Sequence, residues 1–459
     1  MALTIAPGHI AAPVTESSPA RPGRSCLGPS RAAVSATLAA NETMDARRRR
    51  GEPVLPMGFG EAGLPVHPLL REALAEAACC NSYGPVAGHG ALRAAAASYW
   101  GRRGLPTDPD LVVAGPGSKA LLFGLISAIG GDVAVARPSW VSYAAQAPLA
   151  GHAAHFVPGD GGVPDAGQLS CAVSAARAAG RRVRSVVVTL PDNPTGTLAP
   201  PAAVRDLCSV AERHDLIIIS DEIYRDLVHD GGAGFASPEF TSPAALAPER
   251  TVVTTGLSKH LALGGWRLGV ARMPEGWLGP ELAGRLLAVG SEIWSAPAGP
   301  VQQAAALAFA EPPELAERVA LSRRLHASVA REVALRFAKG GASVPAPQAA
   351  FYVYPDFSPL AGVLLERHGI AGDDGLAALL LDRYGVCVLP GSAFGEPAWR
   401  LRLRAATSLL YGETETQRIA ALDAADPCSL PWIAASLDRL DEVLADLTGC
   451  GGGTSRRSG

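Results

Sequence analysis

The chain has few charged residues, and their charges nearly cancel. Among its 459 residues, 18% are Asp, Glu, Lys or Arg, and the formal net charge is −3. So small a charge leaves no electrostatic footprint for nucleic-acid binding. Hydrophobic residues make up 48% of the sequence, which excludes a wholly disordered chain. The 51 glycines and 38 prolines follow no collagen-like or heptad period, which excludes a fibre.

Long apolar runs and metal-binding cysteine patterns are also missing. The best candidate for a membrane span, residues 120–131, is too short to cross a bilayer. The eight cysteines form no CxxC pair, so we expect free thiols in a reducing, cytoplasmic compartment. His152 and His155 resemble half of a metal site, but we favour two ordinary loop histidines. The sequence therefore predicts a globular protein without a metal or a membrane anchor.

The two ends of the chain differ in composition from the middle. Residues 1–50 are rich in Ala, Ser, Pro and Arg and contain no apolar segment of signal-peptide length. We expect a disordered extension there, with an organellar transit peptide as the alternative. The glycine-rich residues 448–459 predict a flexible tail.

Short, β-branched, nearly uninterrupted apolar runs alternate with helical patterns in the middle of the chain. Strands of this kind are buried on both faces, which is typical of a mainly parallel sheet between two layers of helices. The sequence therefore predicts an α/β fold. The five clearest strands are residues 111–114, 132–136, 185–190, 216–220 and 251–255.

Polar residues follow three of these strands, where open α/β sheets bind their ligands. Each has an ordinary explanation by itself, such as a turn, a helix cap or a surface lysine. Five such residues at one sheet edge are hard to explain as a coincidence. They are an amide, a carboxylate, a phenol, a lysine and an arginine: Asn193, Asp221, Tyr224, Lys259 and Arg267.

This set suits pyridoxal 5′-phosphate. A lysine amine can form a Schiff base with the cofactor's aldehyde. A carboxylate can keep the pyridine nitrogen protonated, while an amide and a phenol can bond the ring oxygen. A Gly/Ser turn at a helix N-terminus can bind the phosphate together with an arginine. The turn of Gly117, Ser118 and Lys119 follows a strand and opens a helical run, so we assign it to the phosphate.

Three motifs identify a family resemblance that runs from about residue 54 to the 440s. The chain resembles the class I/II aminotransferases of the fold-type I pyridoxal-phosphate enzymes. The motifs are Asn193-Pro194-Thr195-Gly196, Asp221-Glu222-Ile223-Tyr224, and Ser258-Lys259 followed by Gly265-Trp266-Arg267-Leu268-Gly269.

The resemblance implies a role for each motif residue. Lys259 would form the Schiff base and carry the proton, with Asp221 on the pyridine nitrogen. Asn193 and Tyr224 would bond the ring oxygen. Ser258 and Arg267 would bind the phosphate, although Gly256 stands where many relatives have a phosphate-binding serine.

Further residues match positions with known roles in the family. Tyr83 would reach a phosphate in the partner subunit, which implies a homodimer, and Trp140 would stack on the cofactor. Gly60 matches a backbone position beside the substrate. Register with the family makes Arg402 the fork for the substrate α-carboxylate. Spacing alone cannot choose among the arginines on one strand face, Arg400, Arg402 and Arg404.

The resemblance also implies a domain division and an activity. Residues 81–330 would form a large cofactor domain with a mainly parallel central sheet sandwiched by helices. Residues 52–80 and 331–447 would form a smaller α+β domain. The expected activity is transfer of an amino group between an amino acid and a 2-oxo acid by a ping-pong aldimine mechanism.

Other functions remain open at this stage. Lyases, cyclases and synthases with the same cofactor share these motifs. A weaker alternative is an NADP-dependent oxidoreductase, because residues 115–120 fit G-x-G-x-x-A. That fingerprint leaves Lys259, Asp221 and Asn193 unexplained. A cofactor-binding regulator would need a DNA-binding domain, and the segment before residue 52 is too short and too poor in helical periodicity for one.

Overall fold

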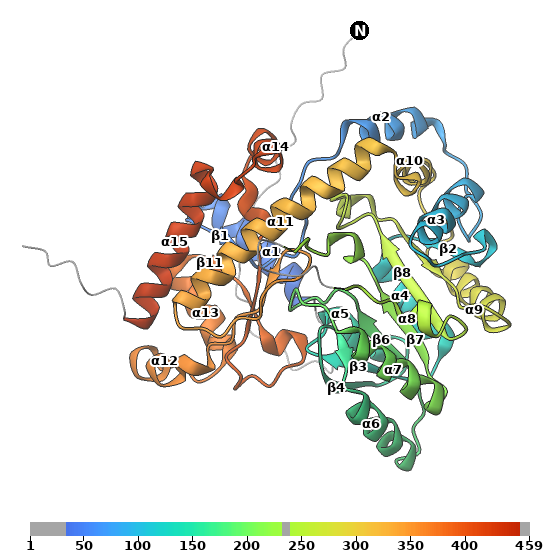
Figure 1. The fold of residues 1–459 in the computed structure, drawn as a ribbon, viewed down its shortest axis with the longest axis horizontal. Helices are drawn as coiled ribbons and strands as arrows, with labels where there is room; N and C mark the ends of the chain where they lie inside the picture. Colours follow the sequence, from blue (N-terminus) through green and yellow to red (C-terminus); the bar gives the residue numbers. More distant parts are fainter. Residues whose placement is uncertain (1–33, 232–238, 450–459) are drawn as a thin grey trace, which may run out of the picture. The chain divides into compact units, whose positions relative to one another are not determined.

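An eight-stranded sheet runs through the larger part of the structure (Figure 1). The computed structural model describes residues 34–231 and 239–449. The strand order is β2-β9-β8-β7-β6-β3-β4-β5, and only β9 and the edge strand β5 run antiparallel to their neighbours. The strands are β2 Val112–Gly115, β3 Asp132–Arg137, β4 Ala154–Asp160, β5 Val163–Pro164, β6 Val183–Thr189, β7 Ile217–Asp221, β8 Thr251–Gly256 and β9 Gly269–Arg272. The predicted α/β fold is confirmed.

Alternate residues of the central strands face opposite helix layers. In β6, Val186 and Val188 pack with the helices α6 and α7, whereas Val187 packs with α4 and α9 on the other face. Both faces are buried, which explains the uninterrupted apolar sequences. These helices are α4 Ser118–Ile129, α5 Val141–Leu149, α6 Ala166–Ala178, α7 Pro201–His214 and α9 Leu278–Ile293.

A second helical group covers the β2 end of the sheet. Trp100 of α3 and Phe309 of α10 are fully buried there with Val112 and Val253 of the sheet. The C-terminal end of α3 therefore lies against the sheet, a position that matters for the site. The group comprises α2 Pro68–Glu76, α3 Gly90–Arg102 and α10 Gly299–Ala310, and the short α8 Pro243–Leu246 packs nearby.

The C-terminal elements enclose a core of their own, which Leu55, Met57 and Leu64 share with residues 325–447. The helix α11 Pro313–Lys339 runs from beside α10 into this core, so the predicted domain boundary at residue 330 falls inside one helix (Figure 1). The division into two domains stays a prediction. The elements are β1 Leu55–Pro56, β10 Tyr352–Val353, α12 Ala361–His368, α13 Asp373–Tyr384, β11 Val386–Cys387, β12 Leu389–Pro390, β13 Leu403–Ala406, α14 Glu415–Asp423 and α15 Pro431–Thr448.

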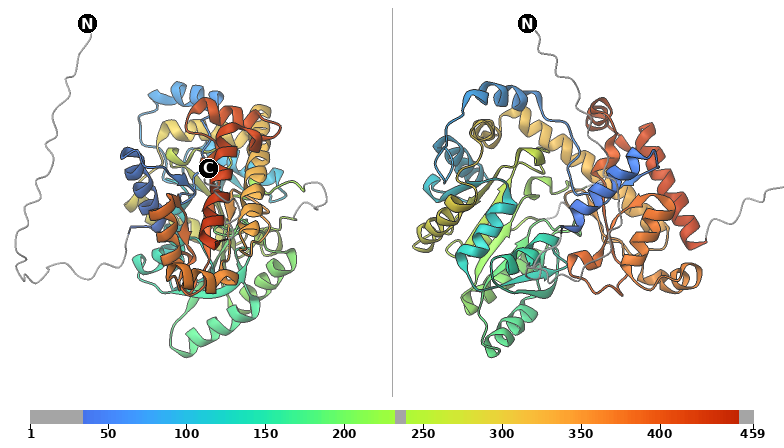
Figure 2. Two further views of the ribbon diagram at one scale, coloured as in Figure 1. Left: turned by 90° about the vertical axis from the view of Figure 1, so that its left-hand side faces the viewer. Right: turned by 180° about the vertical axis from the view of Figure 1, so that it is seen from behind.

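The structure corrects the expected disorder of residues 1–50 in its last third. Ala36–Arg49 form the helix α1, which lies beside the C-terminal elements (Figure 2, right). The Ala- and Arg-rich composition that suggested disorder also has high helix propensity. Met44 anchors the helix because it is fully buried, and Arg47 forms an ion pair with Glu52. Residues 1–33 and 450–459 of the predicted extension and tail lie outside the described residues.

None of the helices within 34–231 and 239–449 is long and apolar enough to cross a bilayer. The same residues contain no group of three or more His, Cys, Asp or Glu side chains arranged to hold a metal ion.

Candidate functional site

A pocket lies at the carboxyl ends of β6, β7 and β8. Because parallel strands end at the same sheet edge, residues far apart in sequence converge there. The pocket is lined by seven predicted site residues, namely Gly60, Ser118, Trp140, Asn193, Asp221, Tyr224 and Lys259. It is also lined by residues that the sequence analysis did not select, including Thr37, Tyr143, Tyr352 and Arg404.

Lys259 has the character of a nucleophilic lysine. Its Nζ donates a hydrogen bond of 2.5 Å to the carbonyl oxygen of Gly60. Burial and the nearby Arg404 charge together lower the pKa of Lys259 to about 8, against the opposing effects of Glu61 and Asp221. A substantial fraction of the amine is therefore neutral near physiological pH, the form that attacks a carbonyl.

Asp221 is held in one orientation by two donors behind it. The carboxyl is 3% exposed, and it accepts hydrogen bonds from the Tyr143 hydroxyl at 2.9 Å and the Thr254 hydroxyl at 3.3 Å. Burial raises the pKa of Asp221 to about 6, while these hydrogen bonds lower it. The group is thus mainly an oriented carboxylate at neutral pH. Tyr143 comes from α5, and no local motif predicted its contact.

The Asn193 side chain faces the pocket with an unsatisfied atom. The residue is 4% exposed, and its Oδ1 has no hydrogen-bond partner among the residues described. Buried polar atoms are nearly always bonded, so an orphaned one in a pocket indicates a place for a ligand. The Trp140 ring also lines the pocket, and it packs edge-on against Tyr143 with 5.2 Å between ring centroids.

The N-terminus of α4 forms an anion cradle with Arg267. The helix begins at Ser118, directly after Gly117, whose positive φ of 88° is natural only for glycine. The Arg267 guanidinium lies over Gly117 where a side chain would stand, and Arg267 itself adopts a left-handed φ of 52°. Strained backbone of this kind clusters at functional sites. Free backbone N–H groups and a cation together suit a phosphate.

Two other predicted residues flank this cradle. Burial lowers the pKa of Lys119, and the Arg267 charge adds to the effect. Ser258 directly precedes Lys259 and is half-buried, but it is not among the residues that line the pocket.

The three C-terminal arginines differ sharply in their surroundings. Arg402, the predicted carboxylate fork, is outside the pocket lining and forms ion pairs with Asp356 at 2.9 Å and Glu396 at 2.8 Å. Arg400 lies 3.9 Å from Glu396. Arg404 is 1% exposed, lines the pocket and has no carboxylate partner within the described ranges.

The geometry favours Arg404 over Arg402, whose role as the carboxylate ligand stays a prediction. Among the described residues, acids lie within ion-pair distance of Arg402 but not of Arg404. Arg404 donates to the carbonyl of Gly58, and burial lowers its pKa. A buried guanidinium without an acid partner is costly unless a ligand supplies the anion. Arg404 is therefore the arginine that the pocket offers to a carboxylate.

Tyr83 stands apart from the pocket of its own chain. The side chain is 93% exposed and is not part of the pocket lining. Its expected contact with a partner subunit stays a prediction.

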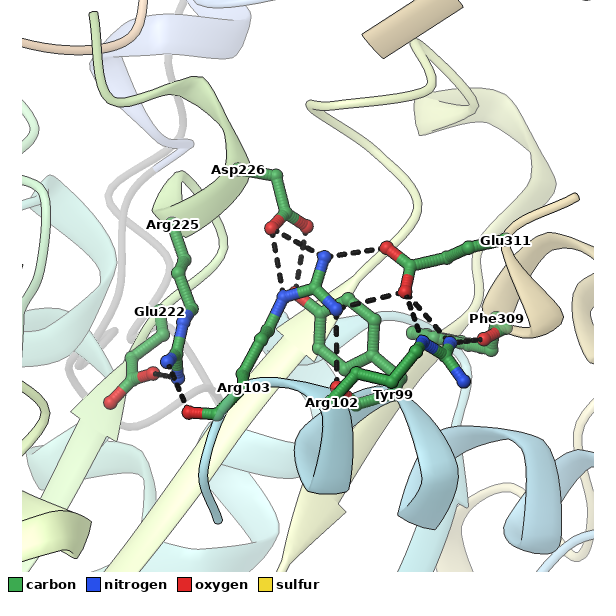
Figure 3. Close-up of polar contacts among 8 residues, drawn as sticks. All are labelled: Tyr99, Arg102, Arg103, Glu222, Arg225, Asp226, Phe309 and Glu311. Atoms are coloured by element: carbon green, nitrogen blue, oxygen red, sulfur yellow. Dashed lines mark hydrogen bonds and ion pairs between the residues drawn. The ribbon is translucent and has the colours of Figure 1, made fainter. Parts of the chain in front are cut away.

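A partly buried ionic network holds Asp226, which follows Tyr224 by two residues (Figure 3). The Arg103 guanidinium, at the end of α3, contacts Asp226 at 2.7 Å and Glu311 at 2.5 Å. The Tyr99 hydroxyl donates to the other oxygen of Asp226 at 2.7 Å. Because Asp226 lies just beyond Tyr224, the network ties this turn to two helices and keeps the pocket wall in place.

Comparisons with known proteins agree with this geometry. The family "Aminotransferase class I and II" matches residues 58–409. An aspartate/prephenate aminotransferase of Thermus thermophilus is 32% identical over 395 residues, covering 82% of this chain and 92% of the relative. An aspartate aminotransferase of Geobacillus stearothermophilus is 32% identical over 398 residues, covering 84% and 95%.

Solved structures show the same similarity. An aspartate aminotransferase from Thermus thermophilus with maleate superposes with a TM-score of 0.74 at 28% identity, covering 89% of this chain and 96% of that chain. An aromatic aminotransferase from Pyrococcus horikoshii superposes with a TM-score of 0.70 at 25% identity, covering 88% and 99%.

The fold and the site define an α/β protein with a pocket at the sheet edge that a partly buried lysine lines. The chain belongs to the class I/II aminotransferase family. It is a transaminase, as predicted, of the fold-type I class. The family implies pyridoxal phosphate as cofactor and an amino acid and a 2-oxo acid as substrates.

Proposed function

We propose that the chain binds pyridoxal 5′-phosphate in this pocket and uses Lys259 to move the proton in amino-group transfer. The observation that carries the proposal is that the partly buried Lys259 amine, whose pKa is lowered, lines the same pocket as the oriented Asp221 carboxylate. The pocket-lining Asn193, whose Nδ2 amide can donate to a ring oxygen, and the anion cradle at α4 fit the ring and the phosphate of this group.

Each residue has a definite task in this proposal. When bound, the cofactor supplies an electron sink for the substrate α-carbon. Asp221, oriented by Tyr143, keeps a proton on the pyridine nitrogen. Asn193 and Tyr224 bond the ring oxygen, and Trp140 covers the ring.

The anion cradle and the lysine complete the assignment. Ser118, Ser258 and Arg267 hold the phosphate, with the backbone N–H groups of the α4 N-terminus. The Nζ of Lys259 takes the substrate α-proton and returns it, because its lowered pKa lets the amine act as a base near neutral pH.

The substrate carboxylate binds beside Gly60. Arg404 supplies the guanidinium, and Gly60 leaves room beside it, since a Cβ there would lie 3.3 Å from Arg404 Nη1. We assign the α-carboxylate to Arg404 in place of Arg402. The geometry of a guanidinium matches a carboxylate with two parallel hydrogen bonds.

An acidic amino acid is the proposed amino donor. The similar proteins are named aspartate or aspartate/prephenate aminotransferases, which supports this choice. Thr37 also lines the pocket from α1, and its Oγ1 is buried without a partner in the described structure. This hydroxyl is available to the distal end of a substrate.

The assembly and the compartment are further parts of the proposal. The exposed phenol of Tyr83 supports a homodimer in which this ring meets the partner subunit. The free cysteines among the described residues, such as Cys208 and Cys387, support a reducing, cytoplasmic compartment.

Borohydride reduction tests the central assignment. The protein is loaded with pyridoxal phosphate, reduced, digested and mapped by mass spectrometry. The label should fall on Lys259, and Lys259→Ala should carry none. Label on another lysine, such as Lys119, would refute the assignment. Mixing the loaded enzyme with single amino acids then identifies the donor from the change in visible absorbance.

A further inference from the structure

A second phenol meets Tyr224 inside the pocket. Tyr352, on β10, is fully buried and lines the pocket. Its hydroxyl oxygen lies 2.7 Å from that of Tyr224, and the two rings pack edge-on with centroids 5.5 Å apart. The residues are separated by 128 positions in sequence, so only the tertiary fold creates this pair.

The Tyr352 hydroxyl lies between the two halves of the site. A Cβ added to Gly60 would come within 2.5 Å of the hydroxyl oxygen, so the phenol fills the space beside this glycine. The Arg404 guanidinium carbon is 5.1 Å from the centre of the Tyr352 ring. Tyr352 thus joins the proposed ring-oxygen ligand to the proposed carboxylate site.

One phenol of the pair must donate and the other accept, because each hydroxyl has a single hydrogen. Burial raises the pKa of Tyr224 well above its usual value, and Tyr352 raises it further. Burial also raises the pKa of Tyr352, but the charge of Arg404 is the largest opposing effect there. Tyr352 is therefore the better donor, and the hydrogen of Tyr224 is left free for another acceptor.

We propose that Tyr352 is a positioning residue for amino-group transfer, whose hydroxyl donates to Tyr224 and so directs the Tyr224 hydrogen toward the ring oxygen of the bound cofactor. The inference rests on the proposed function. Hydrogen bonds in a chain polarise one another, so the Tyr352 donor also strengthens the bond that Tyr224 makes.

Other charged groups face the two phenols and must be kept constant in a test. The Lys259 Nζ lies 5.7 Å from the Tyr224 ring centre, and the charge of Asp221 also acts on Tyr224. Asp192 and Arg404 act on Tyr352. The substitution Tyr352→Phe leaves all four groups and the ring contact with Arg404 in place, so it removes only the hydroxyl.

The test compares Tyr352→Phe with Tyr354→Phe in the enzyme loaded with pyridoxal phosphate. Tyr354 is a matched control, because its buried hydroxyl has no partner in the structure described and does not line the pocket. The pH midpoint of the cofactor's visible absorbance should rise by about 0.5–1 unit in Tyr352→Phe, since a weaker donor stabilises the ring oxygen anion less. We expect kcat to fall roughly three- to tenfold, KM to change less than about twofold, and the control to match the wild type.

A double-mutant cycle separates positioning from a general structural effect. In a Tyr224→Phe background, adding Tyr352→Phe should shift the midpoint no further, because Tyr352 acts through Tyr224. An unchanged midpoint in the single variant, an equal shift in both backgrounds, or a rise in KM alone would overturn the inference. If the wild type itself shows no cofactor absorbance, the proposed function fails together with the inference. A wild type that binds the cofactor while Tyr352→Phe leaves the midpoint in place refutes the inference alone.

Discussion

Replacing Arg404 with lysine tests which arginine receives the substrate carboxylate. Arg404 is buried in the pocket and has no acid partner among the described residues, whereas Arg402 is neutralised by Asp356 and Glu396. Lysine keeps the positive charge that acts on Lys259 but loses the planar fork. The variant therefore tests the loss of the two parallel hydrogen bonds without the loss of the positive charge.

The size of the effect follows from the lost hydrogen bond. A guanidinium offers a carboxylate two charged hydrogen bonds, and an ammonium in the same place offers one. One such bond contributes about 1.5–3 kcal/mol. Since about 1.4 kcal/mol is a factor of ten, kcat/KM should fall roughly 10- to 150-fold, mainly through KM.

The assay compares Arg404→Lys with Arg402→Lys under steady-state conditions with the amino donor that the wild type prefers. Arg402→Lys should leave KM within about threefold of the wild type, because its partners are acids of the protein and not the ligand. Thermal unfolding of both variants checks that each is folded. A large KM increase in Arg402→Lys combined with a wild-type KM in Arg404→Lys would refute the assignment. It would support Arg402 instead, the arginine that register with the family predicts.

The remaining predictions concern the acid and the lysine of the pocket. Asp221→Ala should lower kcat by a hundredfold or more, on the order of a lost acid–base group, even when the cofactor is retained; undiminished turnover would remove Asp221 from the mechanism. The rate at which cofactor-free protein takes up pyridoxal phosphate should increase as the pH rises toward about 8, because the pKa of Lys259 is lowered to that value and the neutral amine is the reactive form. Stopped-flow absorbance measures this rate, and a flat profile between pH 6 and 9 would contradict the lowered pKa.

Much of the fold and part of the site follow from local sequence patterns. Buried parallel strands need apolar residues on both faces. The apolar segments that form β3, β6, β7 and β8 can therefore be recognised from the sequence alone. The residues directly after these strands must lie at one sheet edge, and this places Asn193, Asp221, Tyr224 and Lys259 together in the pocket.

Local patterns could not identify the contacts between distant segments. Period-two alternation puts Arg402 and Arg404 on one side of a strand, and only the docking of Asp356 and Glu396 shows which arginine is already neutralised. The composition of the Ala- and Arg-rich residues 36–49 fits a disordered tail as well as a helix. Only the tertiary structure, in which Met44 is buried, shows that they form a helix.

The sequence by itself determined the strand-end chemistry, because each strand and the polar residues after it are neighbours along the chain. Only the tertiary structure decided which side chains support that chemistry. Tyr143 reaches Asp221 from another helix, and Tyr352 reaches Tyr224 across 128 positions. Such contacts depend on how layers pack in three dimensions, and no spacing within a single segment encodes them.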